Sequence, residues 1–231
     1  MPRTIIIGDI HGSISEYKEI LNLVDYKSPN VRIILLGDQI DRGEDSNACI
    51  ALSRELKIEC VMGNHEQKFL LWLRGDRKPT PNKPHYLKFS NKDIEYISSM
   101  PTYIKVGNTI VVHAGLRAGV SLSNQTENDL LHIRFSTSQG NFVSLKKILK
   151  YGKEATDAHF WTEYGSFGYD IVYGHQVHSM DNICIDRYND GTACYGLDTG
   201  VVFGGKLSVL VLETKEVIQV QAKNIYYKRT L

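Results

Sequence analysis

The first third of the chain alternates short apolar runs with amphipathic segments. The apolar runs at residues 4–8, 31–37 and 58–63 have the length of buried strands, and each ends in a glycine. Residues 13–24 and 45–56 lie between these runs and carry apolar side chains at the spacing of a helix with one buried face. Strands and helices that alternate in this way predict a βαβαβ unit with parallel strands.

Polar residues that can cap a first turn mark two of the helix starts. Ser13 with Glu16 has the spacing of a capping box. Asn124 with Glu127 has the same spacing, ahead of a helix that should run to Leu131. We expect these side chains to bond to backbone N–H groups that the helices leave unpaired.

The remaining chain is predicted to hold more strands than helices. Helices are expected at residues 66–74, 90–99, 145–151 and 155–164. Strands are expected at residues 101–106, 109–113, 171–174, 182–186, 192–197, 207–213 and 217–221. Residues 75–90, rich in proline and basic side chains, predict an irregular loop, either functional or a solvated surface insertion. We expect one α/β domain over residues 1–231, with crossover strands first and a more antiparallel half packed on them.

Composition narrows the class of protein. A chain of 231 residues with 42% apolar and 23% charged residues can build one sizeable core. The formal net charge of +1 argues against stable nucleic-acid binding through bulk electrostatics. No apolar run approaches the roughly 20 residues of a membrane span, and the first residues do not form a signal pattern. We therefore expect no membrane association, and a monomer or weak oligomer.

The cysteines bear on the redox compartment. Four of them, at positions 49, 60, 184 and 194, contain no Cys-x-x-Cys spacing. This arrangement suits neither a zinc knuckle nor a disulfide framework, so reduced thiols in a cytoplasmic protein are expected. Cys184 and Cys194 lie on neighbouring predicted strands, and a facing pair there is the alternative.

Ligand-type side chains follow the apolar runs directly. Asp9 and His11 follow the first run, Asp38 the second, and Asn64 with His65 the third. The carboxyl ends of parallel strands meet at one edge of a sheet, where open α/β sheets hold their ligands. Two later strands end in histidines of the same kind, His113 and His175.

Six of these side chains form a mixed nitrogen and oxygen donor set without a thiolate: Asp9, His11, Asp38, Asn64, His113 and His175. Such a set suits Mn²⁺ first, with Fe, Zn²⁺ or Ni as alternatives. Six donors are too many for one open catalytic ion and suit two divalent ions about 3.5–4 Å apart, bridged by one carboxylate. Asp38 is the expected bridge, because its strand lies between the other two in sequence.

Five motifs, in order, resemble the phosphoprotein-phosphatase branch of the calcineurin-like metallophosphoesterases. They are Gly8-Asp9-Ile10-His11-Gly12, Gly37-Asp38-x-x-Asp41-Arg42-Gly43, Gly63-Asn64-His65-Glu66, His113-Ala114-Gly115-Leu116 and Gly174-His175, and they span about three quarters of the chain. The resemblance implies a β-sandwich flanked by helices, with a two-metal phosphoesterase site. It implies that Asp9, His11 and Asp38 hold the first metal. It implies that the second is held by Asp38, Asn64, His113 and His175.

The same resemblance implies roles in catalysis. A metal-bridging hydroxide would attack phosphorus in line, and Arg42 and Arg134 would bind the phosphoryl oxygens together with Asn64. His65 would be the general acid that protonates the leaving oxygen. Asp41 would orient His65 and raise its pKa.

Three departures from the family pattern leave the ligands intact. Ala114 replaces a glycine, Gln39-Ile40 replaces the common Tyr-Val, and His132 stands where bacterial members have tryptophan. These changes indicate a smaller bacterial or phage-type member and leave the substrate open.

Three functions fit these observations. The first hypothesis is a Ser/Thr-type protein phosphatase that acts on phosphorylated proteins. The alternative is a dinucleoside polyphosphate hydrolase, which the excess of basic residues over 74–92 favours because it could contact a polyphosphate chain. A non-catalytic phosphopeptide-binding module is the third, and the intact ligands and the Asp41–His65 pair argue against it.

Overall fold

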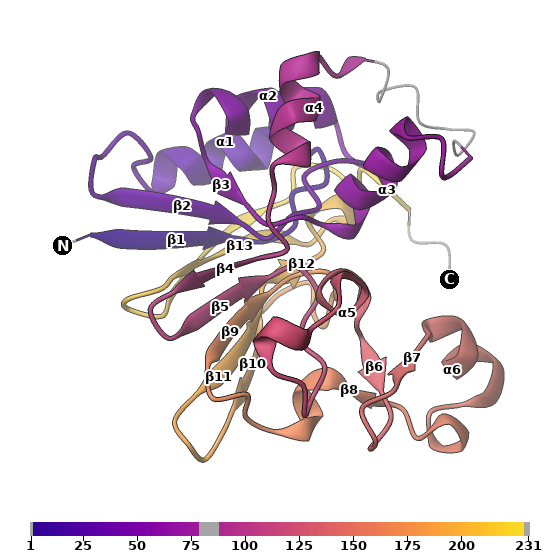
Figure 1. The fold of residues 1–231 in the computed structure, drawn as a ribbon. Helices are drawn as coiled ribbons and strands as arrows, with labels where there is room; N and C mark the ends of the chain where they lie inside the picture. The colour runs from indigo at the N-terminus through magenta and orange to yellow at the C-terminus, as the bar shows by residue number, and fades with distance from the viewer. Residues whose placement is uncertain (1, 79–87, 229–231) are drawn as a thin grey trace.

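The computed structural model describes residues 2–78 and 88–228, which build two β-sheets packed face to face with helices outside them (Figure 1). In the first sheet β1 (Arg3–Ile7), β2 (Val31–Leu35) and β3 (Glu59–Cys60) are parallel neighbours. Helices α1 (Ile14–Leu23) and α2 (Ser46–Glu55) are the crossovers between them. The predicted βαβαβ unit is confirmed, and β2 lies between β1 and β3 in space as well as in sequence.

The C-terminal strands complete the first sheet. β13 (Lys206–Val211) runs antiparallel to β1 and also pairs antiparallel with β12 (Asp198–Thr199) and with β14 (Glu216–Gln221). The expected separation into a crossover half and an antiparallel half is therefore wrong for these strands.

The second sheet has the order β10-β11-β9-β5-β4. Its strands are β4 (Tyr103–Val106), β5 (Thr109–Val112), β9 (Asp170–Tyr173), β10 (Cys184–Arg187) and β11 (Ala193–Gly196). The pairs β5–β9 and β9–β11 are parallel. The carboxyl ends of β5 and β9 therefore share one edge of this sheet.

Burial on both faces explains the continuous apolar run of β1. Ile6 packs between the sheets with Ile34, Val111 and Val172, while Ile5 and its neighbours on the other face lie against α1 and α2. A strand covered on both faces reads as uninterrupted apolar sequence instead of an alternating one.

A small three-stranded sheet projects beside α5 (Glu127–His132), in the lower right of Figure 1. It contains β6 (Phe135–Ser136), β7 (Phe142–Val143) and β8 (His159–Phe160), with α6 (Leu145–Tyr151) attached. The predicted helix at 155–164 is wrong. Asp157 takes a left-handed conformation with φ 47° that stops a short turn, and the chain then enters β8 to pair with β6.

Both predicted capping patterns are wrong. Ser13 precedes α1 but makes no side-chain cap, and Glu16 instead accepts the Lys223 N–H at 2.7 Å and the Tyr226 hydroxyl at 2.9 Å. Before α5 the cap is Thr126, whose hydroxyl accepts the Asp129 N–H at 3.2 Å. Glu16 binds the C-terminal segment instead of the start of α1, and the Thr126 hydroxyl caps α5 in place of Asn124.

Two more helices follow the predictions closely. α3 (Asn64–Leu73) begins two residues earlier than expected, and α4 (Asn91–Ser98) lies where it was predicted. Most of the predicted 75–90 loop, residues 79–87, lies outside the described residues. Within the described ranges no helix is long and apolar enough to cross a bilayer.

All four cysteines are free. Cys184 lies opposite Gly196 in the β10–β11 register, and Cys194 lies opposite Asp186. The alternative of a facing pair is therefore wrong, because the two positions are offset along the ladder.

Candidate metal centre

The predicted ligand side chains come together at the carboxyl ends of both sheets. Asp9 and His11 follow β1, Asp38 follows β2, Asn64 begins α3, and the remaining two, His113 and His175, follow β5 and β9. Each of the six is at most 8% exposed. Two sheets thus converge on one buried centre, which neither could form alone.

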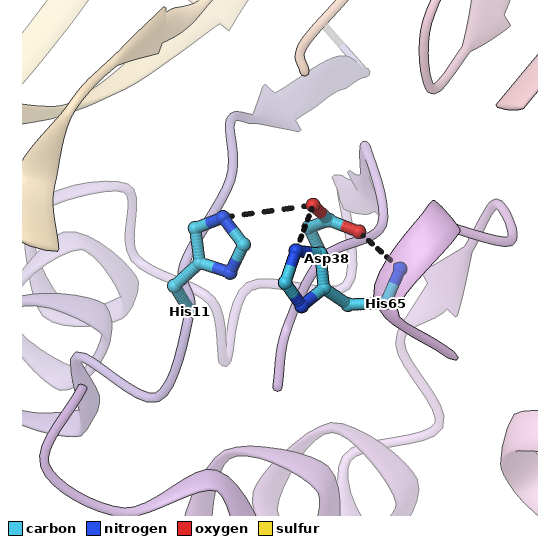
Figure 2. A group of neighbouring side chains, drawn as sticks. All are labelled: His11, Asp38 and His65. Carbon is cyan, nitrogen blue, oxygen red and sulfur yellow. Dashed lines mark hydrogen bonds and ion pairs between the residues drawn. The ribbon is translucent and has the colours of Figure 1, made fainter. Parts of the chain in front are cut away.

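Asp38 occupies the middle of this centre. Its Oδ2 lies 3.5 Å from His11 Nε2 and 3.8 Å from His65 Nε2 (Figure 2). Its Oδ1 lies 3.5 Å from His113 Nε2. The two carboxylate oxygens therefore face different histidine groups, the arrangement expected of a bridging ligand. Oδ1 also accepts the backbone N–H of His65 at 2.9 Å, which orients the carboxylate.

Backbone carbonyls select the tautomers of two histidines. Nδ1 of His11 donates to Ile40 O at 2.9 Å, and Nδ1 of His113 donates to Leu36 O at 2.7 Å. Each Nε2 is then left with a lone pair directed into the centre. This second hydrogen bond is typical of histidines that bind metals.

A second group of acceptors surrounds one point beside Asp38. The atoms His113 Nε2, His175 Nδ1 and Asn64 Oδ1 lie 3.1 Å from one another. Rotation of the Asn64 amide would let its nitrogen donate to both histidines, with its oxygen accepting from Lys68 at 2.8 Å. With the amide oxygen inward, two imidazoles and an oxygen form the donor set of a divalent cation, so these residues fit a metal ion.

The electrostatics of the centre keep its three histidines and Asp38 in metal-binding form. Burial lowers the pKa of His11, His113 and His175, so these rings are neutral near pH 7. Burial alone would raise the pKa of Asp38, but the surrounding histidines, His113 first, hold it well below its usual value. A neutral imidazole and an ionised carboxylate are the forms that bind metal ions.

Asp9 sits against the turn that carries His175. Its carboxylate accepts the His175 N–H at 3.1 and 3.2 Å. A Cβ on Gly174 would lie 2.0 Å from Asp9 Oδ1, so only glycine leaves room for this approach. Burial, followed by the charges of Asp198 and Asp38, raises the pKa of Asp9 well above its usual value.

His65 lies beside the centre with both ring nitrogens engaged. Nδ1 contacts the Asp41 carboxylate, and Nε2 lies 3.1 Å from Arg42 Nη2. Arg42 Nη1 also lies 2.5 Å from His11 Nε2, at the face of the predicted site. The expected effect of Asp41 on the pKa of His65 is present but outweighed, because burial lowers that pKa more than Asp38 and Asp41 raise it.

Arg134 contacts the backbone and neighbour of His175. Its Nη2 donates to the His175 carbonyl at 3.1 Å, and its Nε donates to Gln176 Oε1 at 2.9 Å. Both predicted phosphate-binding arginines, Arg42 and Arg134, therefore border the centre on different elements.

Two buried carboxylates were missed by the sequence analysis as functional residues. Glu66 accepts the backbone N–H groups of Asp38 and Gln39 at 2.8 Å, and those of Ile40 and Gly63 at 3.2 Å. It therefore holds the loop that carries the central aspartate. Asp198 follows the β11 strand, which ends in Gly196, and so has the strand-glycine-ligand order of the predicted ligands, with Leu197 between the glycine and the acid.

Curated proteins of similar length resemble this chain throughout. A symmetrical bis(5'-nucleosyl)-tetraphosphatase of Haemophilus ducreyi is 26% identical, over 94% of this chain and 97% of its own. The asymmetrical bis(5'-nucleosyl)-tetraphosphatase PrpE of Oceanobacillus iheyensis is also 26% identical, over 94% and 92%. Serine/threonine-protein phosphatase 1 of Salmonella typhimurium is 28% identical, over 88% and 89%.

Solved structures with a similar fold carry descriptions of the same two kinds. A crystal structure provisionally described as a diadenosine tetraphosphatase superposes with a TM-score of 0.80 at 24% identity, covering 97% of both chains. A Saccharomyces cerevisiae protein serine/threonine phosphatase superposes with a TM-score of 0.59 at 15% identity, covering 96% of this chain and 80% of its own. The family model described as calcineurin-like phosphoesterase matches residues 2–205. The chain therefore belongs to the calcineurin-like phosphoesterases, hydrolases of phosphoester bonds that use a divalent metal centre.

Proposed function

We propose that this protein hydrolyses bis(5'-nucleosyl) tetraphosphates. The observation that supports this best is the buried His/Asp centre bordered by two arginines, in a chain whose length and sequence follow those of the tetraphosphatases end to end. The sequence analysis placed protein phosphatase first, and similarity to these relatives favours its alternative instead. Membership of the phosphoprotein-phosphatase branch of this family is part of the same proposal.

We assign the ligands as the motifs implied. Asp9, His11 and Asp38 would hold a first divalent ion, and Asp38 would share a second with the remaining three, Asn64, His113 and His175. Divalent ions bound there supply Lewis acidity and a water activated for attack on phosphorus. Mn²⁺ is the proposed metal because the donors mix imidazole with hard oxygen.

Two arginines of the chain would neutralise the negative charge of the polyphosphate substrate. The guanidinium groups of Arg42 and Arg134 border the centre from two elements, so each can neutralise phosphoryl oxygens of an extended polyphosphate. Asn64, at the start of α3, would also bind the phosphate. A chain of four phosphates gives both arginines a partner at once.

His65 is proposed to protonate the leaving oxygen, with Asp41 holding its ring. The Asp41 contact places the proton-bearing Nδ1 away from the centre and Nε2 toward it. Arg42 donates to that Nε2, so substrate must draw Arg42 onto phosphate before Nε2 can carry a proton to the leaving group. Asp41 acts through His65 and is a positioning residue.

Phosphoprotein phosphatase activity is the second candidate. The 28% identical Salmonella relative supports it, and the same centre would serve both substrates because it acts on phosphorus alone. A serine leaving group has a high pKa and needs protonation more than a nucleotide leaving group does.

The test is a steady-state comparison of diadenosine tetraphosphate with a phosphoserine peptide, with Mn²⁺ present. We expect a higher kcat/KM on the tetraphosphate, and product analysis identifies the bond cleaved. A preference for the phosphopeptide would overturn the proposal in favour of the second candidate. The Asp38→Asn protein, purified in parallel, controls for contaminating phosphatases.

A further inference from the structure

Asp198 lies at the edge where the ends of the two sheets meet. Leu197, the residue before it, donates its N–H to Tyr173 O at 2.8 Å, at the end of β9. On its other side a Cβ on Gly8 would lie 2.8 Å from Leu197 O, at the end of β1. The backbone leading to Asp198 is therefore wedged between the two strands that deliver Asp9 and His175.

The Asp198 carboxylate is buried and accepts a backbone hydrogen bond. It is 7% exposed, and its Oδ1 accepts the Gly200 N–H at 3.0 Å. No ion pair joins it to Arg42 or Arg134 in the described part of the chain, although both guanidinium groups lie close enough to lower its pKa. Burying a carboxylate without a paired charge is unfavourable, because the group loses its hydration.

Asp198 lies close enough to Asp9 for the two carboxylates to interact electrostatically. Asp198 is the charged group with the largest effect on the Asp9 carboxyl, larger than that of Asp38. Burial raises the pKa of Asp198 to about 6, and the charge of Asp38 adds to this. Asp198 thus adds a third negative charge that acts on Asp9 and Asp38, and a bound divalent cation relieves such repulsion.

We propose that Asp198 is a third carboxylate of the metal centre, contributing an oxygen to the cation position formed by Asp9 and His11. This inference rests on the proposed two-metal function. A further hard oxygen donor favours Mn²⁺ over Zn²⁺ at that position, because Zn²⁺ prefers fewer ligands with more nitrogen among them.

The test is Mn²⁺ binding to Asp198→Asn, measured by equilibrium dialysis and metal analysis. Asparagine keeps an oxygen for the Gly200 N–H, so the fold should persist, as a wild-type unfolding midpoint would show. We expect one of two bound Mn²⁺ ions to bind about 10–100-fold more weakly, the usual effect of removing a group that supports a metal site. Zn²⁺ binding should change less.

The control is Asp181→Asn, whose carboxylate is 81% exposed and should leave both ions unchanged. If the asparagine variant fails to fold, Asp198→Ser removes the charge and keeps an acceptor for the same N–H. Wild-type affinity for both ions in the folded variant would overturn the role of Asp198 and leave the proposed function standing. A wild-type protein that binds no Mn²⁺ would overturn both.

Discussion

Nδ1 of His65 contacts the Asp41 carboxylate, both side chains being almost fully buried beside Asp38. The contact crosses from the loop after β2 to the start of α3. It fixes the ring so that Nε2 faces the centre, while the backbone N–H of His65 binds Asp38. One residue thus connects the chemistry proposed for the leaving group to the carboxylate proposed to bridge the ions.

Substitution His65→Asn should separate catalysis from metal binding. We expect both Mn²⁺ ions to be retained, because other side chains supply the proposed ligands. Turnover should fall by about two to four orders of magnitude, the range for general acid catalysis. Metal analysis and steady-state kinetics check both parts.

A comparison of substrates with different leaving groups is the control for the His65→Asn prediction. The loss in His65→Asn should shrink on para-nitrophenyl phosphate, whose leaving group needs little protonation, and remain large on an alkyl phosphate. Asp41→Asn should show the same pattern more mildly, since it acts through the ring. Parallel loss of metal and activity in the histidine variant would mean that His65 is a ligand instead.

Substitution Asp38→Asn should abolish activity and lower the bound metal. Its two oxygens face different histidine groups, so losing the charge weakens both proposed ion positions. Metal content and turnover are the measurements, and Asp25→Asn, an exposed aspartate at a left-handed position that asparagine tolerates, is the control. Two ions per chain with near-normal turnover would contradict the bridging assignment.

Substitution Glu66→Gln should destabilise the loop that carries Asp38. The carboxylate accepts four backbone N–H groups, and a glutamine NH₂ would face two of these donors without an acceptor. We expect the free energy of unfolding to fall by about 1–3 kcal/mol, the usual cost of a buried unsatisfied donor. Urea unfolding measures this. Glu55→Gln, with a carboxylate 65% exposed, should change it little.

Substitution Gly174→Ala should displace Asp9 while leaving every proposed ligand residue in the sequence. The added methyl would meet the carboxylate at 2.0 Å, and Gly174 does not require a left-handed backbone. We expect weaker Mn²⁺ binding in a folded protein, checked by dialysis and circular dichroism. Gly107→Ala is the control: it lies in open space at φ 57°, so it should lower stability by about 1 kcal/mol and leave metal binding intact. Unchanged Mn²⁺ affinity in Gly174→Ala would show that the Asp9 carboxylate is not confined there.

His132 should make stability depend on pH in a defined direction. Burial, followed by the charges of His113 and Lys68, lowers its pKa to about 4 from an unfolded value near 6.5. Between these values the unfolded chain holds more protons, so this residue's contribution rises with pH and is lost as pH falls. His132→Gln can still donate to Gln67, whose Oε1 lies 2.8 Å from His132 Nε2.

The measurement is the unfolding midpoint of both proteins from pH 4 to pH 7.5. The glutamine variant should lose less stability than wild type as the pH falls through this window. Identical pH profiles would mean that His132 titrates normally in the folded state.

Local sequence determined the first strands and their ligands. The runs ending at Gly8, Gly37 and Gly63 are mainly apolar because most of their side chains are buried on both faces, and only the exposed pair Arg32 and Glu59 interrupts the second and third runs. The ligand types at their ends also follow from sequence, because parallel strands linked by helices must finish at the same edge. Asp9, His11, Asp38 and Asn64 lie at the centre for this reason, whereas His113 and His175 reach it because the second sheet packs on the first.

Contacts between distant residues were decided only by the tertiary structure. Glu16 has a local capping pattern, yet it binds Lys223 and Tyr226, more than 200 positions away, because the C-terminal segment packs on α1. β13 enters beside β1 for a similar reason: a strand's neighbour is chosen by packing across the whole chain, which no local period records. Asp198 illustrates both: its position after a strand that ends in glycine is visible in the sequence, but its proximity to Asp9 depends on the packing of the two sheets.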